Sequence, residues 1–143
     1  MKREIGKSNI VILGHSGFLG SCLYENFSRD SSYKVLGFSS PQIDLSLSKE
    51  CPKVIEFLDN NTIVIMAASG LVREKSFTAL KKDIDIIVNV ADLISQTSIK
   101  HLIYISSIAV YGRTSDTTID ENSKLRPDDF YSIAKVFGEK IFE

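Results

Sequence analysis

The chain has 143 residues, of which 43% are hydrophobic, and its formal net charge is −1. This length fits a single domain, and the composition is ordinary for a soluble globular core. The charge balance excludes the basic surface typical of nucleic-acid binding, and no apolar run approaches the ~20 residues of a membrane helix. The charged N-terminus lacks a signal-peptide core, and Cys22 and Cys51 match no metal or redox spacing. We therefore expect a cytoplasmic protein with no metal site, no nucleic-acid partner and no membrane partner.

Strand-like and helix-like segments alternate along the chain. Apolar, β-branched runs predict strands at residues 9–13, 33–40, within 60–69 and 101–106. Apolar residues at helical spacing predict helices at residues 18–30, 48–58, 77–96 and 131–143. Residues 43–46 read as a short extended segment and residues 112–130 as a long loop. The alternation predicts an α/β fold, a doubly wound parallel sheet of about four or five strands with helices on both faces.

Two of the predicted helices carry more detailed expectations. Ser48 is the expected N-cap of the helix at residues 48–58. In the helix at residues 77–96, the expected buried stripe consists of Leu80, Ile84, Ile87, Val88, Ala91, Leu93 and Ile94.

A glycine-rich loop, ILGHSGFLGS at residues 12–21, joins the first strand to the first helix. Gly14 allows the sharp turn, Gly17 leaves room for a pyrophosphate, and Gly20 lets helix and strand pack closely. The helix N-terminus offers free amide groups to phosphates. Ser16 is a candidate for a hydrogen bond to phosphate or ribose, whereas His15 is expected to be a loop residue rather than a catalyst. The loop predicts a nucleotide site, and a glycine-rich turn without a ligand is the alternative.

The end of the second strand bears on the choice of nucleotide. Dinucleotide folds that prefer NAD usually carry an acidic residue there, on the ribose hydroxyls. This strand ends with Phe38, Ser39 and Ser40, so no carboxylate would repel a 2′-phosphate. The serine hydroxyls favour NADP, and NAD remains the alternative because no arginine lies at this point.

A tyrosine and a lysine at Y-x-x-x-K spacing, Tyr131 and Lys135, lie one turn apart on the last predicted helix. A free tyrosine has a pKa of about 10 and is a poor base at neutral pH. A nearby ammonium stabilises the phenolate and lowers that pKa. Such a pair can move a proton at a carbinol or carbonyl while a nicotinamide takes or gives hydride.

Three motifs occur in a fixed order: G-x-x-G-x-x-G at residues 14–20, YISSIAVYG at residues 104–112 and YSIAK at residues 131–135. Together they resemble the N-terminal half of an extended short-chain dehydrogenase/reductase, the family of nucleotide-sugar epimerases, dehydratases and reductases. The resemblance implies that Ser107 is the catalytic serine, Tyr131 the acid/base and Lys135 its partner. The cofactor residues that it and the loop analysis indicate are Gly14, Ser16, Gly17, Phe18, Leu19, Gly20, Ser39, Ser40, Asp44, Leu45, Ala67, Ala68, Ser69, Tyr131 and Lys135.

Details of these motifs indicate the branch of the family. Family dehydratases usually carry Asp-Glu after the catalytic hydroxyl residue, and Ile108 and Ala109 stand there, which disfavours dehydration. GHSGFLG together with IDLS is similar to the sugar-nucleotide reductases and reductase-epimerases. Asp83 stands where the family frequently has asparagine, and Ala134 replaces the usual serine of the Y-x-x-S-K helix.

The resemblance implies that residues 1–143 are an NAD(P)-binding Rossmann domain without the C-terminal substrate-binding half. The whole enzyme would interconvert a nucleotide sugar by hydride transfer with NADP or NAD, as an epimerase or a reductase. It also implies a homodimer through the helices at residues 77–96 and 131–143. A non-catalytic dinucleotide-binding module, or an inactive fragment that acts through a partner chain, is the alternative.

Overall fold

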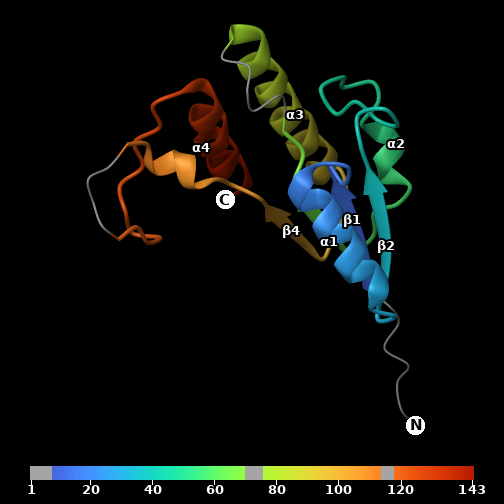
Figure 1. Cartoon of the computed structure of the whole chain (residues 1–143). Helices are drawn as coiled ribbons and strands as arrows, with labels where there is room; N and C mark the ends of the chain where they lie inside the picture. The colour runs from blue at the N-terminus through green and yellow to red at the C-terminus, as the bar shows by residue number, and fades with distance from the viewer. Residues whose placement is uncertain (1–7, 70–75, 114–117) are drawn as a thin grey trace.

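The computed structural model of the chain describes residues 8–69, 76–113 and 118–143. Four strands form one parallel sheet in the order β2-β1-β3-β4. Figure 1 shows β1, β2 and β4 of this sheet with the helices around them. The strands are β1 (Ser8–Leu13), β2 (Tyr33–Phe38), β3 (Thr62–Met66) and β4 (His101–Tyr104). The predicted doubly wound parallel sheet is confirmed.

The order of the strands locates the expected ligand site. The chain steps outward from β1 to β2 and then returns to the other side of β1 for β3 and β4. In register, Leu13 pairs with Phe38 and Met66, and Met66 pairs with Tyr104, so the strands end at one edge of the sheet. Open parallel sheets bind ligands at the carboxyl ends of the strands, where the strand order reverses. Here that point lies beyond the ends of β1 and β3.

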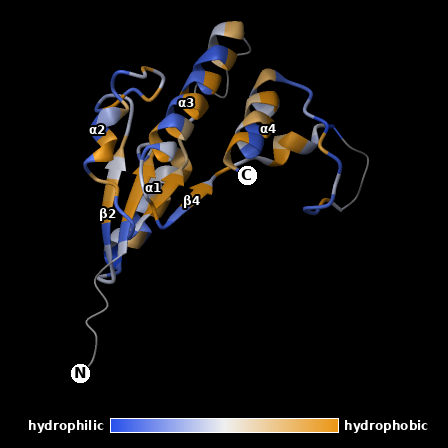
Figure 2. Ribbon diagram, turned by 180° about the vertical axis from the view of Figure 1, so that it is seen from behind, coloured by the Kyte–Doolittle hydropathy of each residue, from blue (hydrophilic) through white to orange (hydrophobic). Residues whose placement is uncertain are grey.

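Helices cover both faces of the sheet. On one face, Ile10, Ile12 and Ile65 pack against α1 (Phe18–Arg29). On the other face, Val11 and the strand residues that share its side pack against α3 (Phe77–Ser95), with α4 (Phe130–Phe142) packed against α3. In Figure 2 the strands are mainly hydrophobic along their length, while α3 alternates between polar and apolar turns. For the two central strands, β1 and β3, this pattern follows from burial, because strands covered on both faces need no polar side.

The caps of the last two long helices explain where they begin. The Ser76 hydroxyl accepts a hydrogen bond of 3.1 Å from the Ala79 amide at the start of α3. Asp129 and Ser132 form a reciprocal capping box at the start of α4. A short 3₁₀ helix, η1 (Ile108–Tyr111), separates β4 from the loop that leads to α4. Among the described residues, none of the helices has the length and apolar character needed to cross a membrane.

The region between β2 and β3 differs from the sequence prediction. The helix predicted at residues 48–58 is only the one-turn α2 (Pro52–Ile55), and its N-cap is Cys51, so Ser48 as N-cap is wrong. Pro52 is the physical reason, since proline has no amide proton and is tolerated only in the first turn of a helix. Residues 43–46, expected to be extended, contain a turn in which the Leu47 amide donates to the Asp44 carbonyl. Part of the predicted loop at 112–130, residues 114–117, lies outside the described residues.

The buried face of α3 is also rotated from the predicted one. Its buried residues are Ala79, Asp83, Ile86, Ile87, Val90 and Leu93. Val88, predicted to be buried, is 45% exposed. The predicted stripe is confirmed at Ile87 and Leu93, which are buried, and is wrong at Val88. Apolar residues surround much of this helix, and a charged residue, Asp83, occupies part of the buried side.

Candidate functional site

The glycine loop turns sharply between β1 and α1. Gly14 has φ +90°, a left-handed conformation that favours glycine, and its amide donates to the Phe38 carbonyl at 2.7 Å. A Cβ at Gly14 would lie 2.6 Å from the Ala68 amide nitrogen, and one at Gly20 would lie 2.2 Å from the Gly14 carbonyl oxygen. The loop therefore packs backbone against backbone, against both β3 and its own helix.

The N-terminus of α1 carries no side-chain cap. Gly17 is the N-cap, in extended conformation, and no side chain of this residue type could cap the helix amides. The first amides of a helix have no partner within the helix and carry a partial positive charge. A Cβ at Gly17 would meet only the Gly14 carbonyl, at 3.4 Å, so glycine is not needed there for the fold itself. Its missing side chain leaves open space in front of the helix.

His15 has a structural position in this loop. Its ring lies 5.4 Å from the ring of Tyr24 on α1. On the strand side, a Cβ at Gly37 would lie 2.4 Å from Cγ of His15. The glycine in β2 therefore leaves the space that the imidazole ring fills. Sequence reasoning noted the histidine but missed this pairing between loop and strand.

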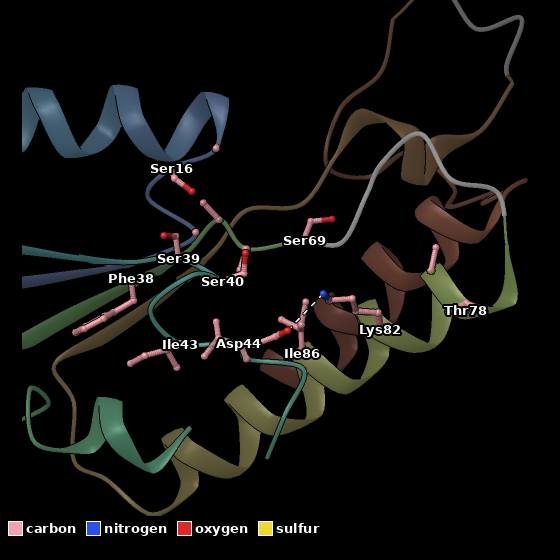
Figure 3. A pocket seen from close by; sticks show the side chains of 16 residues that line it. Ser16, Phe38, Ser39, Ser40, Ile43, Asp44, Ser69, Thr78, Lys82 and Ile86 are labelled. Atoms are coloured by element: carbon pink, nitrogen blue, oxygen red, sulfur yellow. Dashed lines mark ion pairs between the residues drawn. The ribbon is translucent and has the colours of Figure 1, made fainter. Parts of the chain in front are cut away.

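A cavity of about 470 Å³ opens at the carboxyl ends of the strands, next to the glycine loop (Figure 3). Most of the predicted cofactor residues line it: Gly14, Ser16, Gly17, Ser39, Ser40, Asp44, Leu45, Ala67, Ala68 and Ser69. Phe18, Leu19, Gly20, Tyr131 and Lys135 do not line it. Phe18 is 98% exposed, and Gly20 is buried under the loop that it supports.

Helix α3 supplies a wall of this cavity that the sequence analysis missed. The additional lining residues are Phe38, Ile43, Thr78, Ala79, Lys82 and Ile86. Thr78, Lys82 and Ile86 are spaced four residues apart, so they share one face of α3, and Figure 3 shows them along the cavity. That spacing was visible in the sequence, but nothing in the sequence indicated that this face would meet the loop after β2.

Asp44 and Lys82 carry the charges in the lining of this cavity. The Lys82 ammonium lies 3.6 Å from Oδ2 of Asp44, as the dashed line in Figure 3 marks. Oδ1 of Asp44 accepts from the Ser46 hydroxyl at 2.7 Å and from the Ser46 amide at 3.0 Å. The Ser46 hydroxyl, followed by the Ser46 amide and the Lys82 charge, holds the pKa of Asp44 below its usual value. The carboxylate is therefore fixed as an acceptor facing the cavity.

Tyr131 and Lys135 lie together in a second, much smaller pocket of about 10 Å³. Lys135 is 6% exposed, and its ammonium donates to the Ile105 carbonyl at 2.8 Å. The ammonium lies 5.1 Å from the ring centroid of Tyr104 and 5.7 Å from that of Tyr131. Burial lowers the pKa of Lys135, and the Asp83 carboxylate opposes this by favouring the charged form. Ala68 and Ser69 line both cavities, so the two spaces meet at the end of β3.

Ser107 stands apart from that pair, outside the lining of both cavities. It is the N-cap of η1, and its hydroxyl oxygen accepts from the Ala109 amide at 3.2 Å. The neighbouring Ser106 hydroxyl donates instead to the carboxylate of Glu139 on α4. The structure thus brings Tyr131 and Lys135 together and places Ser107 apart from them, at the start of η1.

The described residues contain no group of three or more His, Cys, Asp or Glu side chains that could hold a metal ion. The two cysteines are free, with Cys22 exposed and Cys51 buried.

The comparison with protein families decides the relationship. The family described as "NAD dependent epimerase/dehydratase family" matches residues 10–143. The chain belongs to this family. Its members' extended short-chain dehydrogenase/reductase fold agrees with the parallel sheet and the glycine loop described above.

Individual relatives within and around this family are longer than the chain. A curated 4-epimerase of Escherichia coli O157:H7, N-acetyl-alpha-D-glucosaminyl-diphospho-ditrans,octacis-undecaprenol 4-epimerase, is 27% identical over 93% of this chain and 42% of the epimerase. The Bordetella bronchiseptica enzyme WbmG, solved in complex with NAD, has a TM-score of 0.78 and 18% identity over 99% of this chain and 51% of that one.

A GDP-D-glycero-L-gluco-heptose synthase of Campylobacter jejuni, solved in the presence of NADPH, has a TM-score of 0.76 and 18% identity. The alignment covers 95% of this chain and 42% of the synthase. At these identities the two solved structures are similar to the chain in fold. The chain spans about half the length of the relatives it matches.

Proposed function

We propose that this chain is the cofactor-binding half of an NAD(P)-dependent oxidoreductase or epimerase that acts on a nucleotide sugar by hydride transfer. One observation carries the proposal. The cavity beside the glycine loop meets the pocket of Tyr131 and Lys135 at Ala68 and Ser69. A dinucleotide in the cavity would thus extend from the end of β2 toward the tyrosine–lysine pair.

The residues that would hold the dinucleotide fit that group chemically. The exposed amides of α1 and the open space at Gly17 suit a diphosphate. Asp44 and Leu45 suit the adenine, and the small side chains of Ala67 and Ala68 allow close approach at the end of β3. Nucleotide-sugar substrates are proposed by analogy with the family and with the relatives named above.

We propose NADP as the preferred cofactor. The end of β2 presents the hydroxyls of Ser39 and Ser40, and the cavity lining carries a cation, Lys82. No carboxylate follows β2 until Asp44, which is held by Ser46 and Lys82. Related structures contain NAD or NADPH, so the family accommodates both.

In the proposed chemistry, Tyr131 gives or takes the proton at a substrate hydroxyl or carbonyl oxygen. The bound nicotinamide would supply or accept the hydride. Lys135 stabilises the Tyr131 phenolate through its charge and lies in the same pocket. Ser107 donates its hydroxyl proton to the substrate oxygen, which is compatible with the Ala109 amide occupying one of its lone pairs.

Titration with NADPH and NADH tests the cofactor assignment directly on the 143-residue chain. We expect saturable binding of both, followed by quenching of cofactor fluorescence or by calorimetry, with NADPH bound more tightly. No binding of either dinucleotide at millimolar concentration would overturn the cofactor assignment.

The Tyr131→Phe variant tests the chemistry in the longest form of the protein that the gene encodes. A lost acid/base is expected to reduce turnover by roughly 10²–10⁴-fold, with cofactor binding retained. Tyr33→Phe, at the opposite end of the strands, is the matched control and should keep full turnover. Unimpaired turnover of Tyr131→Phe would exclude Tyr131 as the acid/base.

A dinucleotide-binding module without catalysis is the second candidate. The observation in its favour is the volume of the second pocket, about 10 Å³, which leaves no space for a sugar beside Tyr131. It predicts cofactor binding by the chain with no turnover in the longest natural form.

We also propose a homodimer through α3 and α4. Each of these helices exposes apolar side chains: Val88 is 45% exposed on α3, and Ile133 and Ile141 are each 43% exposed on α4. Sedimentation analysis of Val88→Glu beside the parent chain tests this, with a monomeric variant as the expected result.

A further inference from the structure

The pocket of Tyr131 and Lys135 holds opposite charges out of water. Its lining consists of Ala68, Ser69, Asp83, Ile87, Tyr104, Tyr131, Ala134 and Lys135. The pocket has a volume of only about 10 Å³. Asp83 is 8% exposed and Lys135 is 6% exposed. Two buried side chains of opposite formal charge therefore line one small pocket.

The ammonium of Lys135 needs more compensation than the carbonyl and the two rings beside it supply. It donates to the Ile105 carbonyl at 2.8 Å and faces the rings of Tyr104 and Tyr131. A carbonyl dipole and ring faces favour a cation but carry no formal charge. A buried ammonium without a nearby anion tends to release its proton.

Asp83 is the acidic residue in the lining of the pocket that contains Lys135. It lies on the buried side of α3, which packs directly against α4. Its Oδ1 accepts a hydrogen bond of 3.2 Å from the Ser69 hydroxyl. Because Ser69 lines both cavities, the carboxylate is fixed at the junction between the cofactor cavity and the tyrosine–lysine pocket.

We propose that Asp83 is the counter-ion of Lys135, a positioning residue that keeps the buried lysine charged beside Tyr131. The effect of this pairing on catalysis rests on the proposed function. The charge pairing is a property of the 143-residue chain and can be tested on it alone.

Tyr131 shares this pocket with the charged pair, and its ring centroid lies 5.7 Å from the Lys135 ammonium. The other titratable groups that face this cluster are Tyr104 from β4 and Glu139 from α4. Glu139 is engaged by the Ser106 hydroxyl, so Asp83 is the acid that lines the pocket itself. An asparagine at position 83 would remove the negative charge that supports the Lys135 ammonium.

NMR titration of lysine side chains in the chain without any cofactor tests the pairing. The parent, Asp83→Asn and Asp85→Asn are compared, and the Lys135 signal is assigned by its loss in Lys135→Met. We expect the Lys135 midpoint to move to lower pH in Asp83→Asn and to stay in place in Asp85→Asn. Asp85 is the matched control because it lies on the same helix and pairs with Lys81 at 2.6 Å. An unchanged Lys135 midpoint in Asp83→Asn would overturn the proposal.

The reciprocal measurement covers the case in which Asp83→Asn does not fold. Coupling between two titrating groups is mutual, so removing the lysine charge must raise the Asp83 midpoint. Aspartate carboxyl signals of Lys135→Met are compared with those of the parent, and the same Asp83 midpoint in both would also overturn the pairing. Neither titration uses a dinucleotide, so a failure of NAD(P) binding affects only the proposed function.

Discussion

The glycine-loop side of the site is a large space, here the open region, whereas the α3–α4 side is a tightly packed one, here the closed region. The first is a cavity of about 470 Å³ walled by backbone, hydroxyls and small side chains. The second is a pocket of about 10 Å³ that buries Asp83 and Lys135. An open space with free helix amides suits a large ligand that brings its own negative charges. A tightly packed pocket with buried charges suits a reactive pair, because charges interact more strongly away from water.

Glycines serve the two regions differently. Gly14 is required by its backbone, since its φ is +90° and its Cα lies against the backbone of Ala68. Gly138 in α4 has ordinary helical geometry and is required by a neighbour's side chain. A Cβ there would lie 2.3 Å from the Tyr104 hydroxyl and 2.5 Å from Cζ of its ring. The open region thus depends on chain geometry and the closed region on packing, and the four variants below test this contrast.

Gly14→Ala should have the largest effect. Left-handed strain and a Cβ 2.6 Å from the Ala68 amide together should cost roughly 3 kcal/mol or more, a large part of a domain's stability. Urea unfolding measures this loss. Gly17→Ala is the matched control, because its Cβ would have an ordinary contact of 3.4 Å.

Gly17→Ala should fold like the parent and bind NADPH more weakly, since a methyl group would then stand in front of the α1 amides. If Gly17→Ala were as unstable as Gly14→Ala, the distinction between fold and binding glycines in the loop would be wrong.

Gly138→Ala should reverse the usual sign of a helical glycine replacement. In an unhindered helix interior, alanine stabilises by up to about 1 kcal/mol. Here the clash with the Tyr104 ring should give a net loss of about 1–2 kcal/mol in the free energy of unfolding. The double variant Gly138→Ala/Tyr104→Phe should recover part of the loss, because the hydroxyl is the nearest atom. If Gly138→Ala were instead more stable than the parent, the Tyr104 ring would be able to move away from the added methyl group, and the tight packing of this region would be excluded.

Ser40→Asp tests which dinucleotide the open region prefers. A carboxylate at the end of β2 should repel a 2′-phosphate and weaken NADPH binding by about tenfold relative to NADH, about 1.4 kcal/mol. Ser40→Ala, which removes the hydroxyl without adding charge, is the control and should change the NADPH-to-NADH ratio far less. An unaltered ratio in Ser40→Asp would place the 2′-phosphate elsewhere.

The sequence predicted the open region better than the closed one. Strand, glycine loop and helix are adjacent along the chain, so local geometry places Gly14, Ser16 and Gly17 around one space. The Tyr131–Lys135 spacing was also readable, since it depends on a single helix. These features need little knowledge of how distant elements pack.

What the sequence could not provide depends on contacts between distant elements. Asp83 was expected merely as a departure from the family pattern, and its burial beside Lys135 appears only when α3 packs against α4. Likewise, the sequence could not show that Lys82 lines the cavity, because this depends on α3 lying across from the loop that contains Asp44. The short α2 was missed for a local reason, since the weight of Pro52 within an apolar pattern was underestimated.

Tyr104→Phe should have the smallest effect, which appears only at alkaline pH. Burial, followed by the carboxylates of Asp83 and Glu139, raises the pKa of Tyr104 well above its ordinary value of about 10. Above pH 10 the unfolded chain therefore releases a proton that the folded chain keeps. This contribution to stability is fully present below pH 10 and is lost as the pH rises, by up to about 1.4 kcal/mol per pH unit.

In Tyr104→Phe that contribution is absent, so the free energy of unfolding should fall less steeply between pH 10 and pH 11 than in the parent. Chemical denaturation at several pH values measures the two slopes. Lys135 contributes a pH dependence of the opposite sign. Burial lowers its pKa, so the free energy of unfolding rises with pH until the pKa of lysine in the unfolded chain is reached. Both proteins contain Lys135, so this contribution cancels in the comparison. Equal slopes would mean that the Tyr104 hydroxyl reaches water, and the contrast between an open and a closed region would then lose its clearest thermodynamic sign.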